Sequence, residues 1–221
     1  MTFLKTAIIL IIFTQSLYPR ESVSGDMFDI GNDIIGDAPP VKNWRYLRDE
    51  RVVKQQFDYS CGASSLATIL NEFYKRSVNE KMILEAMNVS GSRASFADMA
   101  NAVPKFGFRA VAYSTSFDQL TKLKIPAVVY LKYRAQDHFS VVRGIDSNTV
   151  WLADPSLGNR YFSRQQFTEM WETRDDEIEK GKILVILPNS ALITSEDFFT
   201  NRPRRPTVLA ESLQLFPDIF N

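Results

Sequence analysis

The spacing of apolar residues changes near Gly107, and this change limits the folds that the chain can adopt. Before Gly107 apolar residues recur every three or four positions, which predicts helices. This spacing is seen at Ala63, Leu66, Ala67, Leu70 and Phe73. After Gly107 come short runs rich in Val, Ile and aromatic residues, broken by turn residues, which predict strands. Helices followed by an antiparallel sheet are typical of an α+β domain.

Boundary residues place the individual elements. Ser60 stands at the N-cap position of the first helix, Asn79 precedes a second helix, and Gly107 ends a third over 96–103. Ser163 and Gln166 have the spacing of a capping box that begins a helix through Trp171. The predicted strands cover residues 108–113, 127–133, 139–143, 149–153 and 183–187.

The amino terminus resembles an export signal. Lys5 precedes an apolar run over 7–13, which is too short for a bilayer span of about 20 residues. Small residues at 23–25 suit cleavage, and an uncleaved membrane anchor is the alternative. We therefore expect a periplasmic protein with a signal peptide over 1–25. A linker over 26–43, a compact domain over 44–188 and a tail over 189–221 follow, and whether the tail covers the domain stays open.

The composition excludes several classes of function. The 26 Lys and Arg residues balance the 26 Asp and Glu residues, and no basic stripe stands out, so we expect no nucleic-acid partner. The chain has 1 Cys and 1 His. These supply too few soft ligands for a typical zinc site, so we expect neither metal nor cofactor. An exported chain with one cysteine also forms no internal disulfide.

The single cysteine and the single histidine are candidates for a catalytic pair. If Ser60 caps the first helix, Cys61 lies in its first turn, where the electropositive helix end favours the nucleophilic thiolate. Such a nucleophile needs a base, which is most often histidine, and His138 begins a predicted strand. The alternative is that neither residue is catalytic, with Cys61 a small buried apolar residue and His138 a structural residue.

An acidic residue is placed to orient His138. Asp154 follows the predicted strand 149–153, and Asp146 to Asn148 suggests a hairpin turn before that strand. If the two strands pair about Ser147, the numbers of opposed residues sum to about 294. His138 then lies opposite a position near 156, close to Asp154. The alternative is that Asp154 with Pro155 merely marks a turn.

An acyl-transfer site also needs donors for the oxyanion. The amide of Cys61 is one, and a side-chain amide just before the helix is the natural second. Gln55 and Gln56 both qualify, and spacing does not choose between them. Phe57 and Tyr59 flank the predicted site and are candidates to line a cleft, or else they are core aromatics.

Taken together, these residues resemble the C39 peptidases, a papain-like family of cysteine peptidases. The resemblance covers about residues 50–188. The pattern is Gln55, then Cys61-Gly-Ala, then His138-Phe-x-Val-Val-x-Gly, then Asp154-Pro. It implies a papain-like fold with helices packed on an antiparallel sheet. It also implies that Cys61 is the nucleophile, His138 the general base and acid, Asp154 its orienting residue, and Gln55 the oxyanion donor.

The sequence departs from the family pattern at several points. Ser60 stands where the family often has an acidic residue, and no G-x-x-x-x-G-K-[ST] nucleotide-binding motif is present. The chain is similar to exported, free-standing relatives found in secretion gene clusters, including those for functional amyloid. The resemblance therefore implies a polypeptide substrate, such as a secreted or amyloid-forming protein, and a possible partner in the secretion machinery.

Two other functions fit the same residues. A non-cleaving peptide-binding module is known within the family, although the presence of Cys61, His138 and Asp154 together favours catalysis. Acyl transfer or transglutaminase chemistry uses the same triad, and residue types do not exclude it.

Overall fold

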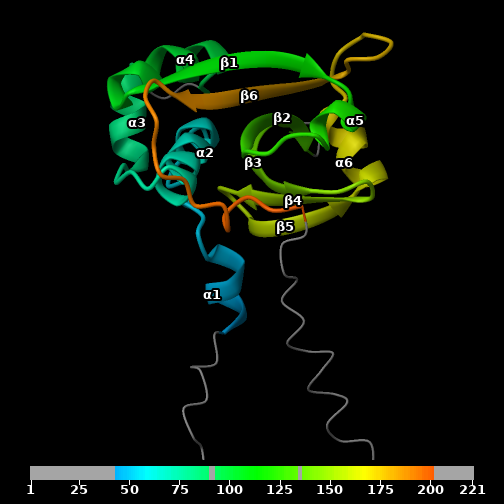
Figure 1. The fold of residues 1–221 in the computed structure, drawn as a ribbon, viewed down its shortest axis with the longest axis horizontal. Helices are drawn as coiled ribbons and strands as arrows, with labels where there is room; N and C mark the ends of the chain where they lie inside the picture. Colours follow the sequence, from blue (N-terminus) through cyan, green and yellow to red (C-terminus); the bar gives the residue numbers. More distant parts are fainter. Residues whose placement is uncertain (1–42, 90–92, 134–135, 202–221) are drawn as a thin grey trace, which may run out of the picture. The chain divides into compact units, whose positions relative to one another are not determined.

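The computed structural model describes residues 43–89, 93–133 and 136–201 (Figure 1). The predicted signal peptide, nearly all of the predicted linker and residues 202–221 of the predicted tail lie outside the described residues. None of the helices in the described ranges has the length and apolarity that a membrane span requires.

The described residues form the α+β fold predicted from the change of period. The helices are α1 (Trp44–Asp49), α2 (Cys61–Thr68), the π-helix η1 (Ile69–Phe73), α3 (Glu80–Met87), α4 (Phe96–Ala102), the 3-10 helix η2 (Val103–Phe106), α5 (Phe117–Leu120) and α6 (Arg164–Trp171). The strands are β1 (Phe108–Thr115), β2 (Ala127–Tyr133), β3 (Gln136–Ile145), β4 (Thr149–Asp154), β5 (Gly158–Ser163) and β6 (Gly181–Pro188).

These strands form an antiparallel sheet in the order β1-β6-β2-β3-β4-β5. Helices α2, α3 and α4 gather beside one part of the sheet, and α5 and α6 lie at another (Figure 1). Residues 139–142 of β3 are buried in succession, so both faces of this strand are covered. Leu66 of α2 and Leu70 of η1 are fully buried, and α2 packs against β3. This packing brings the start of α2 beside the strand that carries His138.

Most predicted elements are present, and their boundary residues explain why. The side chain of Asn79 accepts a hydrogen bond from Met82 N and caps α3. Gly107 has a φ of 85° and ends η2. Both bonds of the predicted capping box at Ser163 are made. Strand β5 was missed because it is a largely exposed strand at the edge of the sheet and lacks an apolar run.

The beginning of the predicted tail packs on the domain. Phe198 is fully buried, and the guanidinium groups of Arg51 and Arg143 lie 5.1 and 4.9 Å from its ring centroid. The backbone N–H of Ser195 donates to Phe73 O at 2.8 Å. Residues 189–201, orange in Figure 1, therefore run across the helices toward the sheet. The sequence left open whether the tail covers the domain, and this part of it does.

The close packing of Gly181 against Trp171 gives a first prediction. A Cβ atom at Gly181 would lie 2.1 Å from the ring of Trp171, which is fully buried. We expect Gly181→Ala to lower the free energy of unfolding by about 1–3 kcal/mol, because an overpacked core must shift. Chemical denaturation measures the loss.

A second glycine supplies the control for this experiment. Gly107 has a φ of 85° but nothing within 4 Å of an added Cβ atom. Gly107→Ala therefore reports backbone strain of about 1 kcal/mol without a clash. A loss at Gly181 no larger than the loss at Gly107 would contradict the packing argument.

Candidate active site

Cys61 begins α2 and Ser60 precedes it at the N-cap position, as predicted. Ser60 occupies the N-cap position without a capping hydrogen bond from its side chain. Its Oγ instead donates to Phe57 O at 2.7 Å and accepts from Phe57 N at 3.2 Å. The predicted N-cap position of Ser60 is therefore confirmed, although its side chain does not make the capping hydrogen bond. Because no cap side chain occupies the first turn of α2, its backbone N–H groups are left to face an anion.

The strand pairing brings His138 and Asp154 together. Val141 pairs with Ala153 and Val142 with Leu152, which is the register predicted for the hairpin. A bulge between Val142 and Gly144 shifts the pairing nearer the turn by one residue. His138 Nε2 and Asp154 Oδ2 are 2.8 Å apart. A carboxylate only accepts, so Nε2 carries the proton.

Cys61 completes this arrangement from the other side of the imidazole ring. The thiol and His138 share a side-chain hydrogen bond. Because Nε2 faces Asp154, the ring nitrogen that remains for Cys61 is Nδ1. Cys61 and Asp154 are 3% and 4% exposed, so the three groups interact with little screening by water. The structure thus brings together the predicted nucleophile, base and orienting residue.

Asp154 is fixed by more than the histidine. Its Oδ1 accepts from Ser156 N at 2.9 Å, Ser156 Oγ at 2.8 Å and Leu157 N at 2.8 Å. With His138, these donors engage both carboxylate oxygens and leave the side chain little freedom to rotate. The role of Ser156 was not predicted from the sequence. The signal for it was the Asp-Pro-Ser order, because an Asp side chain often accepts from residues two or three further on.

The pKa values of the pair shift toward a thiolate and an imidazolium. Burial by itself raises the pKa of Cys61, but hydrogen bonds from His138 and from the backbone of Phe139 and Gly62 outweigh it, so the pKa falls below its ordinary value. Burial by itself lowers the pKa of His138, but hydrogen bonds to Asp154 and Cys61 and the attraction of their charges raise it from 6.5 to about 9. The ion pair therefore exists over a range of pH that ends near 9.

Gln55 lies beside this triad, whereas Gln56 does not enter the site with its side chain. The backbone N–H of Gln55 donates to Pro155 O at 3.1 Å, directly after Asp154. Gln55 Nε2 donates to Phe57 O at 2.9 Å, and its Oε1 is buried without a partner in the described residues. The side chain of Gln56 is exposed. The fold therefore favours Gln55 as the side-chain amide at the site.

Phe57 and Tyr59 flank the loop before the nucleophile. Their rings stack with centroids 5.4 Å apart and an interplanar angle of 11°. Phe57 is 48% exposed, so this stacked pair is a surface feature beside the site and not part of the core.

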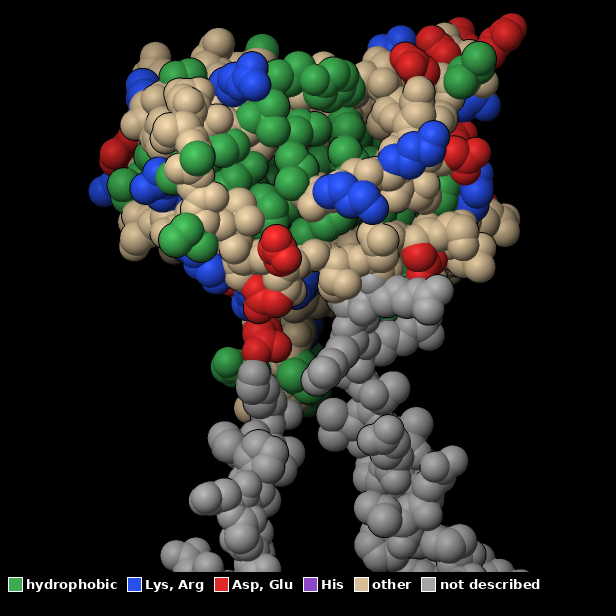
Figure 2. Space-filling view, viewed as in Figure 1, with side chains coloured by type: hydrophobic (Ala, Val, Ile, Leu, Met, Phe, Trp, Pro, Cys, Tyr) green, Lys and Arg blue, Asp and Glu red, His purple; other side chains and the backbone are tan. Residues whose placement is uncertain are grey.

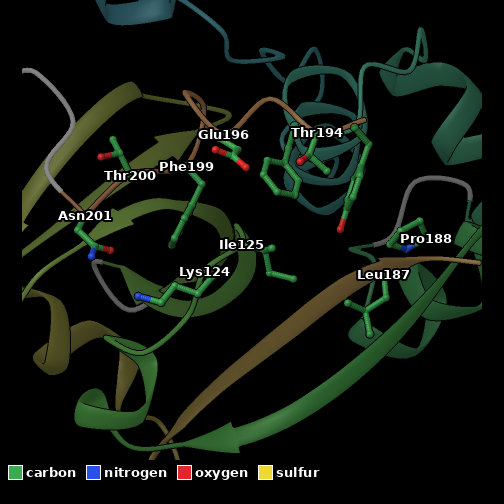
Figure 3. Close-up of a pocket in the computed structure, with 11 residues that line it drawn as sticks. Lys124, Ile125, Leu187, Pro188, Thr194, Glu196, Phe199, Thr200 and Asn201 are labelled. Carbon is green, nitrogen blue, oxygen red and sulfur yellow. The ribbon is translucent and has the colours of Figure 1, made fainter. Parts of the chain in front are cut away.

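A cavity of about 570 Å³ lies elsewhere on the domain. Phe73 and Tyr74 line it, and they follow the end of α2, roughly 18 Å along the helix from Cys61. Hydrophobic side chains gather on this face (Figure 2). Phe199 reaches from the 189–201 segment toward Lys124 across the cavity (Figure 3). The cavity is therefore separate from the triad.

The sequence of this chain matches the peptidase C39 family over residues 49–174, which is more than half of its length. The chain belongs to the peptidase C39 family. The match contains the candidate nucleophile, base, orienting residue and amide. The family and the fold that the sequence analysis inferred by resemblance are thus confirmed.

Relatives of this chain include two from Pseudomonas, each named a probable functional amyloid protease, FapD. The protein of Pseudomonas fluorescens is 35% identical over 138 residues, and that of Pseudomonas aeruginosa is 33% identical. Each alignment covers 59% of this chain and 61% of the relative. The chain therefore spans less than two-thirds of the length of these relatives.

Solved C39 structures share the fold. The peptidase domain of Streptococcus ComA, a bifunctional ABC transporter of a quorum-sensing pathway, superposes with a TM-score of 0.54 at 20% identity, covering 62% of this chain and 97% of that domain. A double-glycine-motif protease from an AMS/PCAT transporter, solved with its leader peptide, gives 0.51 at 25% identity, covering 62% and 90%. Both confirm the α+β arrangement of the C39 peptidase domain.

Proposed function

We propose that this protein is a cysteine peptidase that uses Cys61, His138 and Asp154 as its catalytic triad. The observation that carries the proposal is the continuous chain of contacts from the Cys61 thiol through the imidazole of His138 to the buried carboxylate of Asp154. Such a chain activates the thiol and holds the imidazole in one tautomer.

The reaction follows from the charges at the site. The Cys61 thiolate attacks the scissile carbonyl carbon, a C–S bond forms, and the carbonyl oxygen becomes an oxyanion. His138 Nδ1 gives its proton to the amide nitrogen as the C–N bond breaks, and the amine leaves. His138 then takes a proton from water, whose oxygen attacks the thioester. The carboxylic acid leaves, and the proton on His138 restores the ion pair.

The oxyanion is stabilised by the backbone N–H of Cys61 and by the amide of Gln55. The first lies at the uncapped start of α2, where the helix dipole also favours negative charge. The second is held beside Pro155 by its own backbone. Donors fixed in advance stabilise the transition state because they need no reorganisation during the reaction.

The substrate in this proposal is a secreted polypeptide, and the protein acts in the periplasm. The resemblance of residues 1–25 to an export signal motivates the location. The two relatives named functional amyloid proteases motivate an amyloid-forming protein or its leader as the substrate. A partner in the secretion machinery is part of the same proposal.

A proteome-derived peptide library tests the reaction type. We expect incubation with the full chain to create new amino termini, detected by mass spectrometry, which the Cys61→Ala variant does not create. Isopeptide or acyl adducts in place of new termini would indicate acyl transfer. No covalent change, with peptides retained on the protein, would indicate a binding module.

The dependence of cysteine reactivity on pH gives a second prediction. Because the pKa of Cys61 is lowered, we expect alkylation by iodoacetamide to stay fast well below pH 8. His138→Ala removes the partner but not the burial, so the pKa rises. The rate at pH 7 should then fall by about tenfold for each unit of pKa change.

Comparing the pH dependence of turnover with that of alkylation tests the role of the His138 imidazolium. Turnover needs a proton on His138, so it should fall as pH rises through about 9, the pKa of that group, while alkylation does not fall. The urea-unfolded chain is the control and should titrate near the free-cysteine value of about 8.5. Equal profiles for the folded and unfolded chains would contradict an activated thiol.

A further inference from the structure

Glu80 is a buried carboxylate that the proposed reaction does not use. It begins α3 and is 4% exposed. The ion pairs formed among the described residues do not include it. Burying a carboxylate without a cation is unfavourable unless hydrogen bonds replace its water. The hydrogen-bond donors that contact Glu80 therefore indicate which parts of the domain it connects.

Those donors belong to the two segments that meet at the site. Glu80 Oε1 accepts from the backbone N–H of Gln56 at 2.9 Å and from Ser64 Oγ at 3.2 Å. Gln56 directly follows Gln55, and Ser64 lies one turn along α2 from Cys61. One oxygen atom thus joins the loop that carries the oxyanion amide to the helix that carries the nucleophile.

The same loop is also bonded to the residue that follows Asp154. The backbone N–H of Gln55 donates to Pro155 O at 3.1 Å. Two successive amides of the loop therefore bond to different elements, one next to Asp154 and one to α3. These two bonds therefore hold adjacent residues of the loop to two different parts of the domain. Without Glu80, the loop keeps the Pro155 contact but loses the bridge from the backbone of Gln56 to Ser64 of α2.

We propose that Glu80 is a positioning residue that sets the place of the Gln55 amide relative to Cys61. The inference rests on the proposed oxyanion role of Gln55. It predicts that Glu80 supports steps that create an oxyanion and leaves the reactivity of the thiolate itself unchanged. A residue with a merely structural role would not separate these two properties.

Two reagents measure the two properties on the full chain. Acylation by p-nitrophenyl acetate passes through an oxyanion, forms a thioester at Cys61 and releases p-nitrophenolate. Alkylation by iodoacetamide displaces iodide at a saturated carbon and forms no oxyanion. We expect Glu80→Ala to lower the acylation rate by about tenfold or more, since small misplacements at a reacting centre have large effects. The alkylation rate should stay within about twofold of the original.

Two further variants guard against a folding defect. Glu80→Gln keeps an oxygen that accepts from Gln56 N–H and Ser64 Oγ, so we expect most of the acylation rate to return. Glu85→Ala is the matched control, because Glu85 lies on the same helix, is exposed and pairs with Lys81 at 3.9 Å. It should change neither rate.

A double-mutant cycle with Gln55→Ala decides how Glu80 acts. We expect Gln55→Ala alone to lower the acylation rate by about 100-fold. If Glu80 acts through Gln55, the acylation rate of the double variant should be no lower than that of Gln55→Ala. Losses that multiply, or equal losses of acylation and alkylation in Glu80→Ala, would overturn the proposal. If Gln55→Ala leaves acylation unchanged, the proposed oxyanion role fails as well. If Gln55→Ala lowers acylation and Glu80→Ala does not, only the Glu80 proposal fails.

Discussion

Replacing Cys61 with alanine is expected to abolish acylation and peptide cleavage, with a loss of about 10⁴-fold or more. The thiol is the nucleophile in the proposed reaction, and no other cysteine exists in the chain. The fold should survive because a single sulfur atom is removed and His138 keeps its 2.8 Å contact with Asp154. The rate of p-nitrophenolate release measures the activity, and chemical denaturation measures the stability.

Ser65→Ala is the matched control for this variant. Ser65 lies in the same helix, and its Oγ is buried without a partner in the described residues. Removing an unpaired buried hydroxyl is neutral or stabilising. The activity should therefore be unchanged. Activity that persists in Cys61→Ala, or that is lost equally in Ser65→Ala, would contradict the assignment of the nucleophile.

Asp154→Asn is expected to lower both activity and stability. The carboxylate accepts from His138 on one oxygen and from Ser156 and Leu157 on the other. Either orientation of an amide points its NH₂ group at donors. We expect a loss of about 1–3 kcal/mol in the free energy of unfolding. Because His138 also loses the anion that raises its pKa, acylation should fall by about 100-fold or more.

The pH dependence of the free energy of unfolding tests whether Asp154 stabilises the fold through its negative charge. Burial by itself raises the pKa of Asp154, but the hydrogen bond and charge of His138 and the donors at Leu157 and Ser156 lower it from 3.8. A lowered pKa stabilises the fold above the unfolded value of 3.8, and this stabilisation is lost as pH falls through the folded-state pKa. The wild type and Asp154→Asn should therefore converge in acid. A constant difference down to pH 2 would contradict this account.

Asp146→Asn is the control for Asp154→Asn. Asp146 Oδ1 accepts from Asn148 N and Thr149 N, both at 2.8 Å, in the turn between β3 and β4. It has the same local geometry but no histidine on its other oxygen. Asparagine makes this kind of turn readily, so both activity and stability should be close to those of the wild type.

The sequence determined most of the helices and strands and the approach of His138 to Asp154. Helical and strand periods depend on neighbours a few residues away, so the pattern predicted α2, α3, α4 and most of the strands. The register of β3 and β4 followed from one turn at Asp146, and it placed His138 near Asp154. Because the chain has 1 Cys and 1 His, a Cys-His catalytic pair in it can only be Cys61 with His138.

Only the tertiary structure decided the contact of Cys61 with His138 and the other polar contacts around the site. Gln55 and Gln56 are equivalent by spacing, and the contact of Gln55 with Pro155 distinguishes them. Glu80 stands in the first turn of a helix, where an acidic residue is ordinary, so nothing local marked it as buried beside Gln56. Ser60 has the residue type of an N-cap but bonds to Phe57. Each of these contacts depends on packing between segments that are distant in the chain or on competition among nearby hydrogen-bond acceptors. The spacing of apolar residues along the sequence carries no information about either.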